Sequence, residues 1–159
     1  MTLELRPLAS EDLPRLLRFW TEHWGGEEMI VHGDVFRPEH VRGYVVEGWA
    51  GVVTYLIVGD ECEIISLDSL QPRHGIGTAL INRVVDEARR QACRRVFLST
   101  SNDNLHALGF YQRRGFELVG IRRGAIDESR KTKPGIPLIG QNRIRLRDEV
   151  ELELLLRSP

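Results

Sequence analysis

The order of apolar and polar positions divides the first part of the chain into three segments. Residues 3–5 predict a short strand. Ser10 is a typical N-cap residue, and the apolar positions between it and Trp20 recur at the spacing of one helical face, which predicts a helix. Two consecutive glycines, beginning at Gly25, are expected to end that helix. Residues 25–40 mix Gly, His and acidic residues without a regular period, which predicts a loop or a short helix.

Three strands are expected next, at residues 44–46, 52–58 and 62–70. The connections between them are short and contain glycine, which favours antiparallel hairpins. The second and third strands are apolar at nearly every position. Because a strand with one wet face alternates apolar and polar residues, both faces of these two strands are expected to be covered.

The period changes again after this group of strands. From Thr78 onward, apolar residues fall on one side of a helix and charged residues on the other. Residues 122–148 are basic, contain two prolines and show no regular period, so no element is predicted there. The remaining predictions are strands at 96–99, 116–121 and 149–156, and a helix at 104–114 that ends at Gly115.

These elements predict one α/β domain spanning residues 1–159, with a mixed, mostly antiparallel sheet flanked by helices on both faces. Hydrophobic residues make up 42% of the chain and charged residues 28%, a composition that argues against a disordered chain. Cys62 and Cys93 are too few for a disulfide framework or a four-thiolate metal site, and they are expected to be buried, inert thiols. No signal peptide is recognisable and no apolar run is long enough to span a bilayer, so we expect a cytoplasmic protein without a membrane partner.

Charge is distributed unevenly along the chain although the formal net charge is only −1. Residues 1–70 carry 13 acidic and 5 basic side chains, whereas residues 71–147 carry 16 basic and 6 acidic ones. The near-zero total argues against a strongly basic nucleic-acid-binding protein. The total therefore conceals a division of the chain into an acidic region and a basic region, with the boundary near residue 71.

A buried strand runs into a glycine-containing turn and a helix at residues 66–78. Such a turn directs backbone N–H groups and the positive end of a helix at one place, which suits a phosphate. Gly75 and Gly77 let the backbone approach a ligand closely. The segment is neither a Walker A loop nor a dinucleotide fingerprint, because it lacks the Lys-Ser/Thr pair and has Leu80 where a third glycine would stand.

A second segment, residues 104–116, combines a helix start with an aromatic helix end. Asn104 follows a predicted strand and can cap the helix that begins after it. Tyr111 lies near the end of that helix. Taken alone, each of the two segments also fits ordinary packing.

Together, the two segments resemble the GCN5-related N-acetyltransferase (GNAT) superfamily. That family has an R/Q-x-x-G-x-G/A turn after its fourth strand and a downstream Asn-x-x-Ala-x-x-apolar-Tyr-x-x-x-Gly-Phe helix. The sequence departs from the first pattern at Pro72, which stands where the family has Arg or Gln and has no N–H to donate. The resemblance covers roughly residues 44–121, and the matches are at Gly75, Gly77, Asn104, Ala107, Phe110, Tyr111, Gly115 and Phe116.

This resemblance implies the GNAT fold, in which the fourth and fifth strands separate and acetyl-CoA enters the opening. By position, Leu67 and Ser69 would offer backbone groups to the pantetheine and the acetyl carbonyl. Asn104 would bond the pantetheine arm, and Tyr111 would protonate the departing thiolate, for which a phenol has a suitable pKa. The pyrophosphate would be held by the N–H groups of Arg73, His74, Gly75, Ile76, Gly77 and Thr78.

The residue that removes a proton from the substrate ammonium is left open by the sequence. Glu63 ranks first, since it lies on the fourth strand in phase with Leu67, and Glu61 shares that phase one step further away. Asp68 ranks second, because on a regular strand it points to the opposite face, although a bulge would change this. A water relay without a dedicated base is the remaining alternative. Apolar surroundings would raise the pKa of either carboxylate toward neutrality.

The expected function is therefore an acetyl-CoA-dependent N-acetyltransferase acting on an amine, preferably of a small molecule. The alternatives are a protein N-terminal or lysine acetyltransferase, and a CoA-binding regulatory module without turnover. Glu27 and Glu28 can attract a cationic amine or simply face solvent. The basic residues of 122–133 are expected to face solvent or reach CoA phosphates rather than bind nucleic acid. The histidines have no metal-ligand spacing, so no metal is expected; a homodimer is compatible with the sequence.

Overall fold

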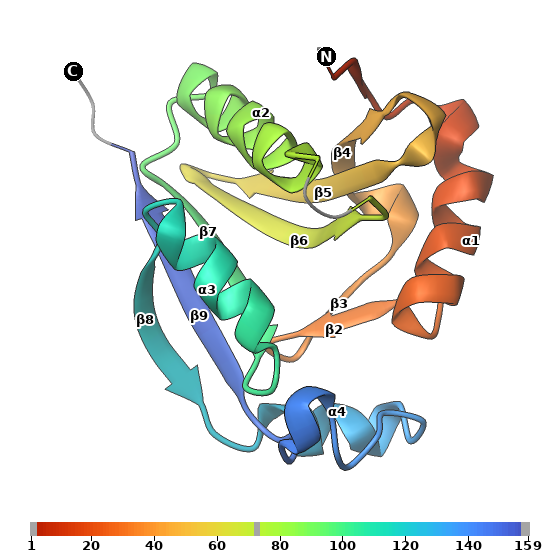
Figure 1. The fold of residues 1–159 in the computed structure, drawn as a ribbon, viewed down its shortest axis with the longest axis vertical. Coiled ribbons are helices and arrows are strands. Elements are labelled where there is room, and N and C mark those ends of the chain that lie inside the picture. Colours follow the sequence, from red (N-terminus) through yellow and green to blue (C-terminus); the bar gives the residue numbers. More distant parts are fainter. Residues whose placement is uncertain (1–2, 72–73, 157–159) are drawn as a thin grey trace.

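The computed structural model describes residues 3–71 and 74–156 (Figure 1). Its main feature is a seven-stranded sheet in the order β1-β4-β5-β6-β7-β9-β8, and a separate two-stranded sheet pairs β2 with β3. Every pairing is antiparallel except that of β6 with β7. The strands are β1 (Leu5–Pro7), β2 (Met29–Val31), β3 (Asp34–Phe36), β4 (Arg42–Val46), β5 (Gly51–Val58), β6 (Glu61–Ser69), β7 (Arg95–Ser101), β8 (Glu117–Arg122) and β9 (Glu149–Leu155).

Helices cover both faces of this sheet, as the apolar central strands predict. The apolar stripe of α2 (Ile76–Arg90) packs on one face, and that core also includes Tyr111 of α3 (Leu105–Arg113). The stripe of α1 (Leu13–Trp24) forms a second core on the opposite face, together with apolar residues of the β2–β3 hairpin. The predicted mixed α/β fold is confirmed. Both cysteines are free and buried, and burial raises the pKa of the Cys62 thiol to about 12.

The two central parallel strands separate along their length. β6 pairs with β7 only from Glu61 to Ile64, opposite Arg95 to Leu98. Beyond Ile64 the strands diverge, and Figure 1 shows β6 running toward the start of α2 while β7 runs toward α3. Because the end of β6 has no β7 partner, this side of the strand is open to a ligand.

Several sequence predictions are corrected by the structure. The first strand is β1 rather than residues 3–5. Ser10 does not cap α1, because it begins a 3₁₀ turn (Ser10–Asp12) that precedes the helix. Residues 25–40 contain the β2–β3 hairpin and a 3₁₀ turn (Pro38–His40). The two strands have three residues each, which is too short for an alternation of apolar and polar residues to be recognised in the sequence. Residues 122–148 contain α4 (Ala125–Thr132) and a 3₁₀ turn (Gln141–Arg143). Another 3₁₀ turn lies at Glu47–Trp49, between β4 and β5.

Candidate active site

A cavity of about 520 Å³ opens where β6 and β7 separate. Its walls come from three elements that are distant in the sequence: the end of β6, the start of α2 and most of α3. The lining residues are Leu67, Asp68, Ser69, Gly75, Ile76, Gly77, Thr78, Asn104, His106, Ala107, Phe110, Tyr111, Arg113 and Arg114. Most of the residues singled out from the two sequence segments therefore meet at one place.

The first turn of α2 presents free backbone N–H groups to this cavity. Gly75 precedes the helix with φ of 72°, a left-handed conformation that favours glycine. The first bond within the helix runs from the N–H of Ala79 to the carbonyl of Gly75 at 3.0 Å. The N–H groups of residues 76–78 consequently have no partner inside the helix, and the positive end of its dipole lies with them. This arrangement suits an anionic group.

Close packing between α2 and α3 fixes the width of the cavity. An added Cβ at Gly77 would lie 3.1 Å from Cζ of Phe110, so glycine allows the close approach of the two helices. The guanidinium of Arg114 lies 3.5 Å from the centroid of the Phe110 ring. It also donates to Oγ1 of Thr78 from Nε at 2.9 Å and from Nη2 at 2.6 Å. The start of α2 is thereby tied to the end of α3.

Asn104 and Tyr111 lie at opposite ends of α3, and both line the cavity. Oδ1 of Asn104 accepts from the N–H of Ala107 at 3.1 Å, which confirms the predicted cap. Tyr111 is buried and packs edge-on against Phe110 and Phe116. Burial raises the pKa of the Tyr111 phenol, and the negative charge of Asp68 adds to that effect. The phenol is therefore held in its protonated form.

A bulge in β6 changes which carboxylates share a face. Ile64 pairs with Tyr55 whereas Ser66 pairs with Thr54, so Ile65 is an extra residue in the strand. Glu63 lies opposite Leu56 and Asp68 opposite Val52, and residues 52 and 56 of β5 point to the same side of the sheet. Glu63 and Asp68 hence both face α1 and the hairpin, whereas Leu67 faces α2. The expectation for a regular strand, with Glu63 and Leu67 in phase, is wrong.

Asp68 is held at the edge of the cavity by helix α1. Its Oδ2 accepts from Nε1 of Trp24, the last residue of the helix, at 2.9 Å. Burial raises the pKa of the Asp68 carboxyl, while the Trp24 hydrogen bond and the nearby His23 oppose that rise. A carboxyl with a raised pKa is able to exchange protons closer to neutrality.

Glu63 lies outside the lining of the cavity and contacts the β2–β3 hairpin instead. Its Oε2 lies 2.7 Å from Nε2 of His32, and Nδ1 of that imidazole lies 3.2 Å from Oδ2 of Asp34. His32 has φ of 44° and the following Gly33 has φ of 86°, as a tight two-residue hairpin turn requires. Burial raises the pKa of Glu63, and His32 opposes the rise. Nothing in the sequence predicts this contact, although the His32-Gly33 pair is a signal for the hairpin turn that makes it.

The remaining predicted cofactor residues are only partly brought together. Ser69 lines the cavity, whereas the exposed His74 does not. Pro72 and Arg73 lie outside the described residues, so their predicted contacts stay predictions. Among the described residues, no group of three or more His, Cys, Asp or Glu side chains could hold a metal ion. None of the described helices is both long and apolar enough to cross a membrane.

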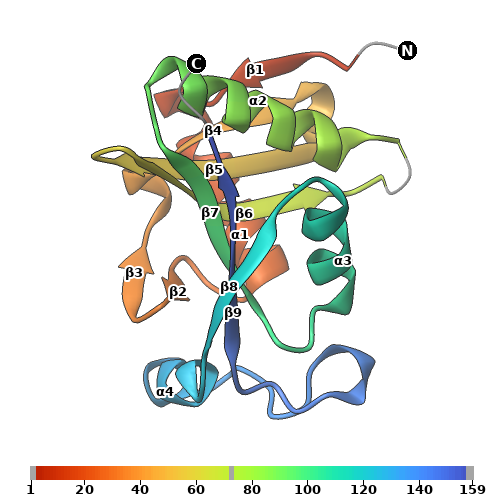
Figure 2. The same cartoon turned by 90° about the vertical axis from the view of Figure 1, so that its left-hand side faces the viewer.

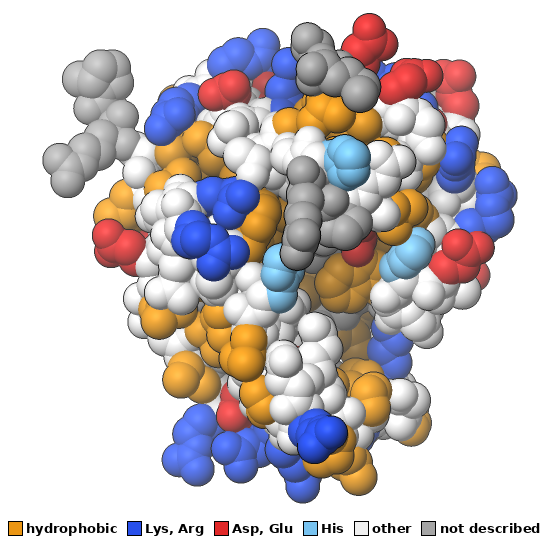
Figure 3. All heavy atoms as spheres, in the orientation of Figure 1, with side chains coloured by type: hydrophobic (Ala, Val, Ile, Leu, Met, Phe, Trp, Pro, Cys, Tyr) orange, Lys and Arg blue, Asp and Glu red, His pale blue; other side chains and the backbone are white. Residues whose placement is uncertain are grey.

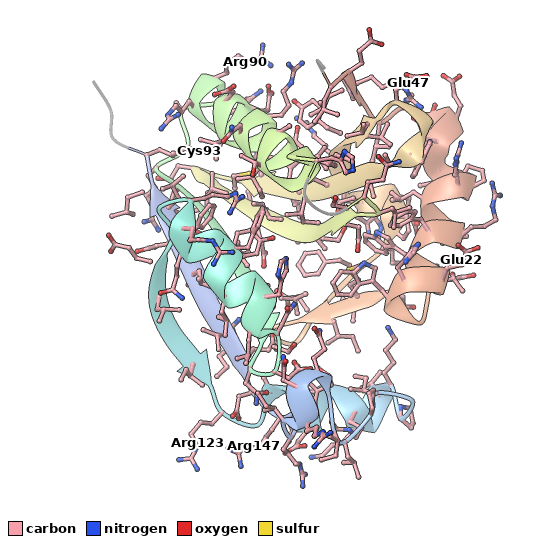
Figure 4. The ribbon with its side chains drawn as sticks, in the orientation of Figure 1. Glu22, Glu47, Arg90, Cys93, Arg123 and Arg147 are labelled. Carbon is pink, nitrogen blue, oxygen red and sulfur yellow. The ribbon has the colours of Figure 1, made fainter. Side chains whose placement is uncertain are left out.

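None of the residues that line the cavity comes from the basic segment between β8 and β9. Figures 1 and 2 both show α4 at the end of the molecule opposite α2, and Lys and Arg side chains gather there in Figure 3. Arg123 and Arg147 point outward at that end (Figure 4). Several basic residues at this end form ion pairs within the protein: Arg122, the last residue of β8, with Glu149 and Glu151, Arg130 with Asp127, Lys131 with Glu128, and Arg147 with Asp148.

The same segment joins the two sides of the site. Asp103, which precedes the N-cap residue of α3, is buried and accepts from the N–H of Gln141 at 2.7 Å. On the other side, Nζ of Lys133 donates to the carbonyl of Glu28 at 2.9 Å, just beyond the end of α1. The segment therefore bridges the α3 side and the α1 side of the open strands.

Comparisons with known proteins agree with this geometry. A model described as the acetyltransferase (GNAT) family matches residues 6–116. The uncharacterized protein YdhI of Bacillus subtilis is 40% identical over 139 residues, which cover 85% of this chain and 87% of that protein. An acetyltransferase of the same organism, solved in complex with CoA, has a TM-score of 0.71 at 20% identity over 98% of this chain and all of that one. A GNAT family acetyltransferase from Elizabethkingia anophelis with acetyl-CoA bound has a TM-score of 0.73 at 18% identity, over 97% of this chain and 98% of that one.

Proposed function

The chain belongs to the acetyltransferase (GNAT) family, and from this premise we propose that it transfers an acetyl group from acetyl-CoA directly to the amine of a small molecule. One observation carries the proposal. A single cavity brings together the free N–H groups at the start of α2, the end of β6 that has no β7 partner, and the buried phenol of Tyr111. These are an anion site, an open strand edge and a proton donor, which are the three parts that such a transfer needs.

The cavity residues fit the chemical parts of acetyl-CoA. The N–H groups of residues 75–78 are suited to hold the pyrophosphate. Leu67, Ile76 and Phe110 supply an apolar wall for the pantetheine arm. The backbone of Ser69 and the side-chain amide of Asn104 can form hydrogen bonds with the polar groups of that arm. When bound, acetyl-CoA supplies an activated thioester carbonyl. Every other requirement of the reaction falls to the protein.

Two proton transfers fall to Asp68 and Tyr111 in this proposal. Asp68 takes a proton from the substrate ammonium, directly or through water, which frees the amine lone pair. The amine nitrogen then bonds to the carbonyl carbon while the carbon–sulfur bond breaks, and Tyr111 gives its proton to the departing sulfur. The raised pKa of Tyr111 keeps the phenol protonated until that moment. The nitrogen gives its second proton to the Tyr111 phenolate, directly or through water, so that a neutral amide and a free thiol leave and the phenol is restored.

The position of Asp68 supports it as the base over Glu63, which the sequence ranks first. Asp68 lines the same cavity as Tyr111, and the two are close enough for the carboxylate to affect the phenol. Glu63 lies on the same face of β6 as Asp68, but its carboxylate is hydrogen-bonded to His32. Glu63 is therefore proposed to hold the hairpin rather than to receive the proton.

The preference for a small acceptor is supported by the segment between β8 and β9. That segment connects Asp103, next to α3, with the end of α1 through Lys133. A connection of this kind bounds the side of the site that Asp68 faces, which favours a compact amine over a polypeptide chain.

Turnover of acetyl-CoA, followed as released thiol, tests the function. The acceptors are a panel of small primary amines, peptides with free N-termini and a lysine-containing peptide with a blocked N-terminus. We expect thiol release above the acceptor-free rate with at least one small amine, and an acetylated amine of the matching mass. Release with peptides alone would assign a protein acetyltransferase. Acetyl-CoA binding without release for any acceptor would assign a regulatory CoA-binding module.

A further inference from the structure

Trp24 makes a hydrogen bond to Asp68 from a distant part of the chain. Its indole Nε1–H donates to Oδ2 of the carboxylate at 2.9 Å, across 44 residues of sequence. Within residues 3–71 and 74–156, the Asp68 side chain makes this one hydrogen bond, and its Oδ1 has no hydrogen-bond partner among those residues. We infer that Trp24 is a positioning residue, which fixes the orientation of the Asp68 carboxylate at the cavity and favours its ionised form. This inference rests on the proposed function of Asp68.

The location of Trp24 shows that its ring is not needed to fill the core. Trp24 is 43% exposed, whereas Trp20, one turn earlier on the same helix, is fully buried. The buried Nε1 of Trp20 has no hydrogen-bond partner among the described residues. Trp20 is thus a packing tryptophan, and Trp24 is a tryptophan whose polar atom is directed at a specific carboxylate.

The backbone of Trp24 is held in place from the opposite side. Gly25, with φ of 77°, ends α1 directly after Trp24. Nζ of Lys133 then donates to the carbonyl of Trp24 at 3.5 Å and to that of Glu28 at 2.9 Å. An added Cβ at Gly26 would lie only 3.2 Å from Cε of Lys133, so this glycine leaves the space that the lysine occupies. The bridging segment and Asp68 therefore hold the end of α1 between them.

The other groups that face Asp68 do not substitute for this hydrogen bond. Among the described residues, neither His23 of α1 nor Tyr111 of α3 makes a hydrogen bond to the carboxylate, although the charge of Asp68 contributes to the raised pKa of the Tyr111 phenol. An N–H that donates to a carboxylate stabilises the ionised form directly. Loss of the indole N–H is therefore expected to raise the pKa of Asp68 further above its ordinary value. The other titratable groups that line the cavity are His106, Arg113 and Arg114.

Carbon-13 NMR of labelled aspartate carboxyls tests the inference without knowledge of the acceptor. The Asp68 resonance is assigned by its loss in Asp68→Asn. In Trp24→Phe, which keeps an aromatic ring but removes the N–H, we expect the titration midpoint of Asp68 to rise by about one pH unit. The matched control is Trp20→Phe, which removes an unpartnered N–H from the same helix and should leave the midpoint unchanged. An unchanged midpoint in Trp24→Phe overturns the inference.

A second pair of variants keeps the test valid if Trp24→Phe does not fold. Lys133→Met loosens the end of α1 and should shift the Asp68 midpoint upward by a smaller amount, while Lys131→Met, whose lysine pairs only with Glu128 in the described chain, should not. Equal midpoints in both lysine variants would contradict the inference. An enzyme that is active but has an unshifted Trp24→Phe midpoint overturns the positioning role alone. Absence of turnover with any amine would instead overturn the proposed function, and would leave the NMR result standing.

Discussion

Nε2 of His32 lies 2.7 Å from Oε2 of Glu63, across 31 residues of sequence. The imidazole stands in the turn of the β2–β3 hairpin, and the backbone N–H of the same residue reaches the buried Glu149 at 3.1 Å. One turn residue therefore connects the hairpin with two strands of the large sheet. This contact separates the two candidate bases, because it binds one carboxylate to the hairpin and leaves Asp68 at the cavity.

His32→Asn is expected to destabilise the protein by about 1 kcal/mol at pH 7. Asn tolerates the positive φ of this turn, so the loss reports mainly on the Glu63 contact. His32 opposes the burial that raises the pKa of Glu63, so its removal costs most where Glu63 is ionised. The difference in unfolding free energy should shrink as pH falls and Glu63 becomes protonated. Urea denaturation at several pH values measures it, and a difference that grows at low pH would contradict this account.

Asp68→Asn is expected to remove the acidic limb of the pH–kcat/KM profile together with most of the activity, by about 10²-fold or more. The base must be ionised to act, and burial raises the pKa of Asp68, so the limb should lie above the ordinary range of a carboxyl. Glu63→Gln is the matched control on the same face of β6 and should keep the limb. If Glu63→Gln loses the acidic limb and Asp68→Asn keeps it, Glu63 would be the base, as the sequence ranks it.

Tyr111→Phe is expected to lower kcat by about 10²-fold or more while the Kd of acetyl-CoA changes little. The phenyl ring keeps the edge-on contacts with Phe110 and Phe116, so the change removes the proton donor and little packing. Tyr55→Phe is the control, since Tyr55 is also buried but does not line the cavity. Single-turnover thiol release and calorimetric titration separate the two effects. An unchanged kcat would exclude Tyr111 as the general acid.

Features set by neighbouring residues were predictable from the sequence. The glycine turn before α2, the Asn104 cap and the left-handed Gly115 each follow from local backbone requirements, and all three are present. The resemblance to the family is also confirmed. The resemblance rests on such local patterns, so a few motif residues were enough to indicate the family.

Features set by distant residues were not predictable. The bulge at Ile65 depends on how β6 registers against β5, and a shift of one residue reverses the face of every side chain that follows. The contacts of Trp24 with Asp68 and of His32 with Glu63 join parts of the chain that only the folded sheet brings together. For this reason the sequence placed both carboxylates on one strand but could not predict which of them lies at the cavity.

Gly77→Ala is expected to weaken acetyl-CoA binding and to destabilise the protein by about 1 kcal/mol. The added Cβ would lie 3.1 Å from the ring of Phe110, which cannot easily retreat because Arg114 stacks over its face. The start of α2 would then move away from α3. Gly120→Ala is the control, since nothing lies within 4 Å of its added Cβ. Calorimetry and thermal unfolding measure both effects, and full affinity in Gly77→Ala would argue against a ligand at this turn.

The affinity for acetyl-CoA is expected to fall as salt concentration rises, because the cavity presents cations to an anionic ligand. Arg113 is exposed on α3 and lines the cavity, whereas Arg123 lies at the end of the molecule that carries α4 (Figure 4). Arg113→Gln should therefore weaken binding and flatten its salt dependence, and Arg123→Gln should change neither. Isothermal titration with acetyl-CoA at several NaCl concentrations measures the slopes. Equal slopes in the two variants would mean that the basic residues of the chain do not attract acetyl-CoA electrostatically. A flatter slope in Arg113→Gln alone would assign the attraction to the arginine at the cavity and not to the basic segment.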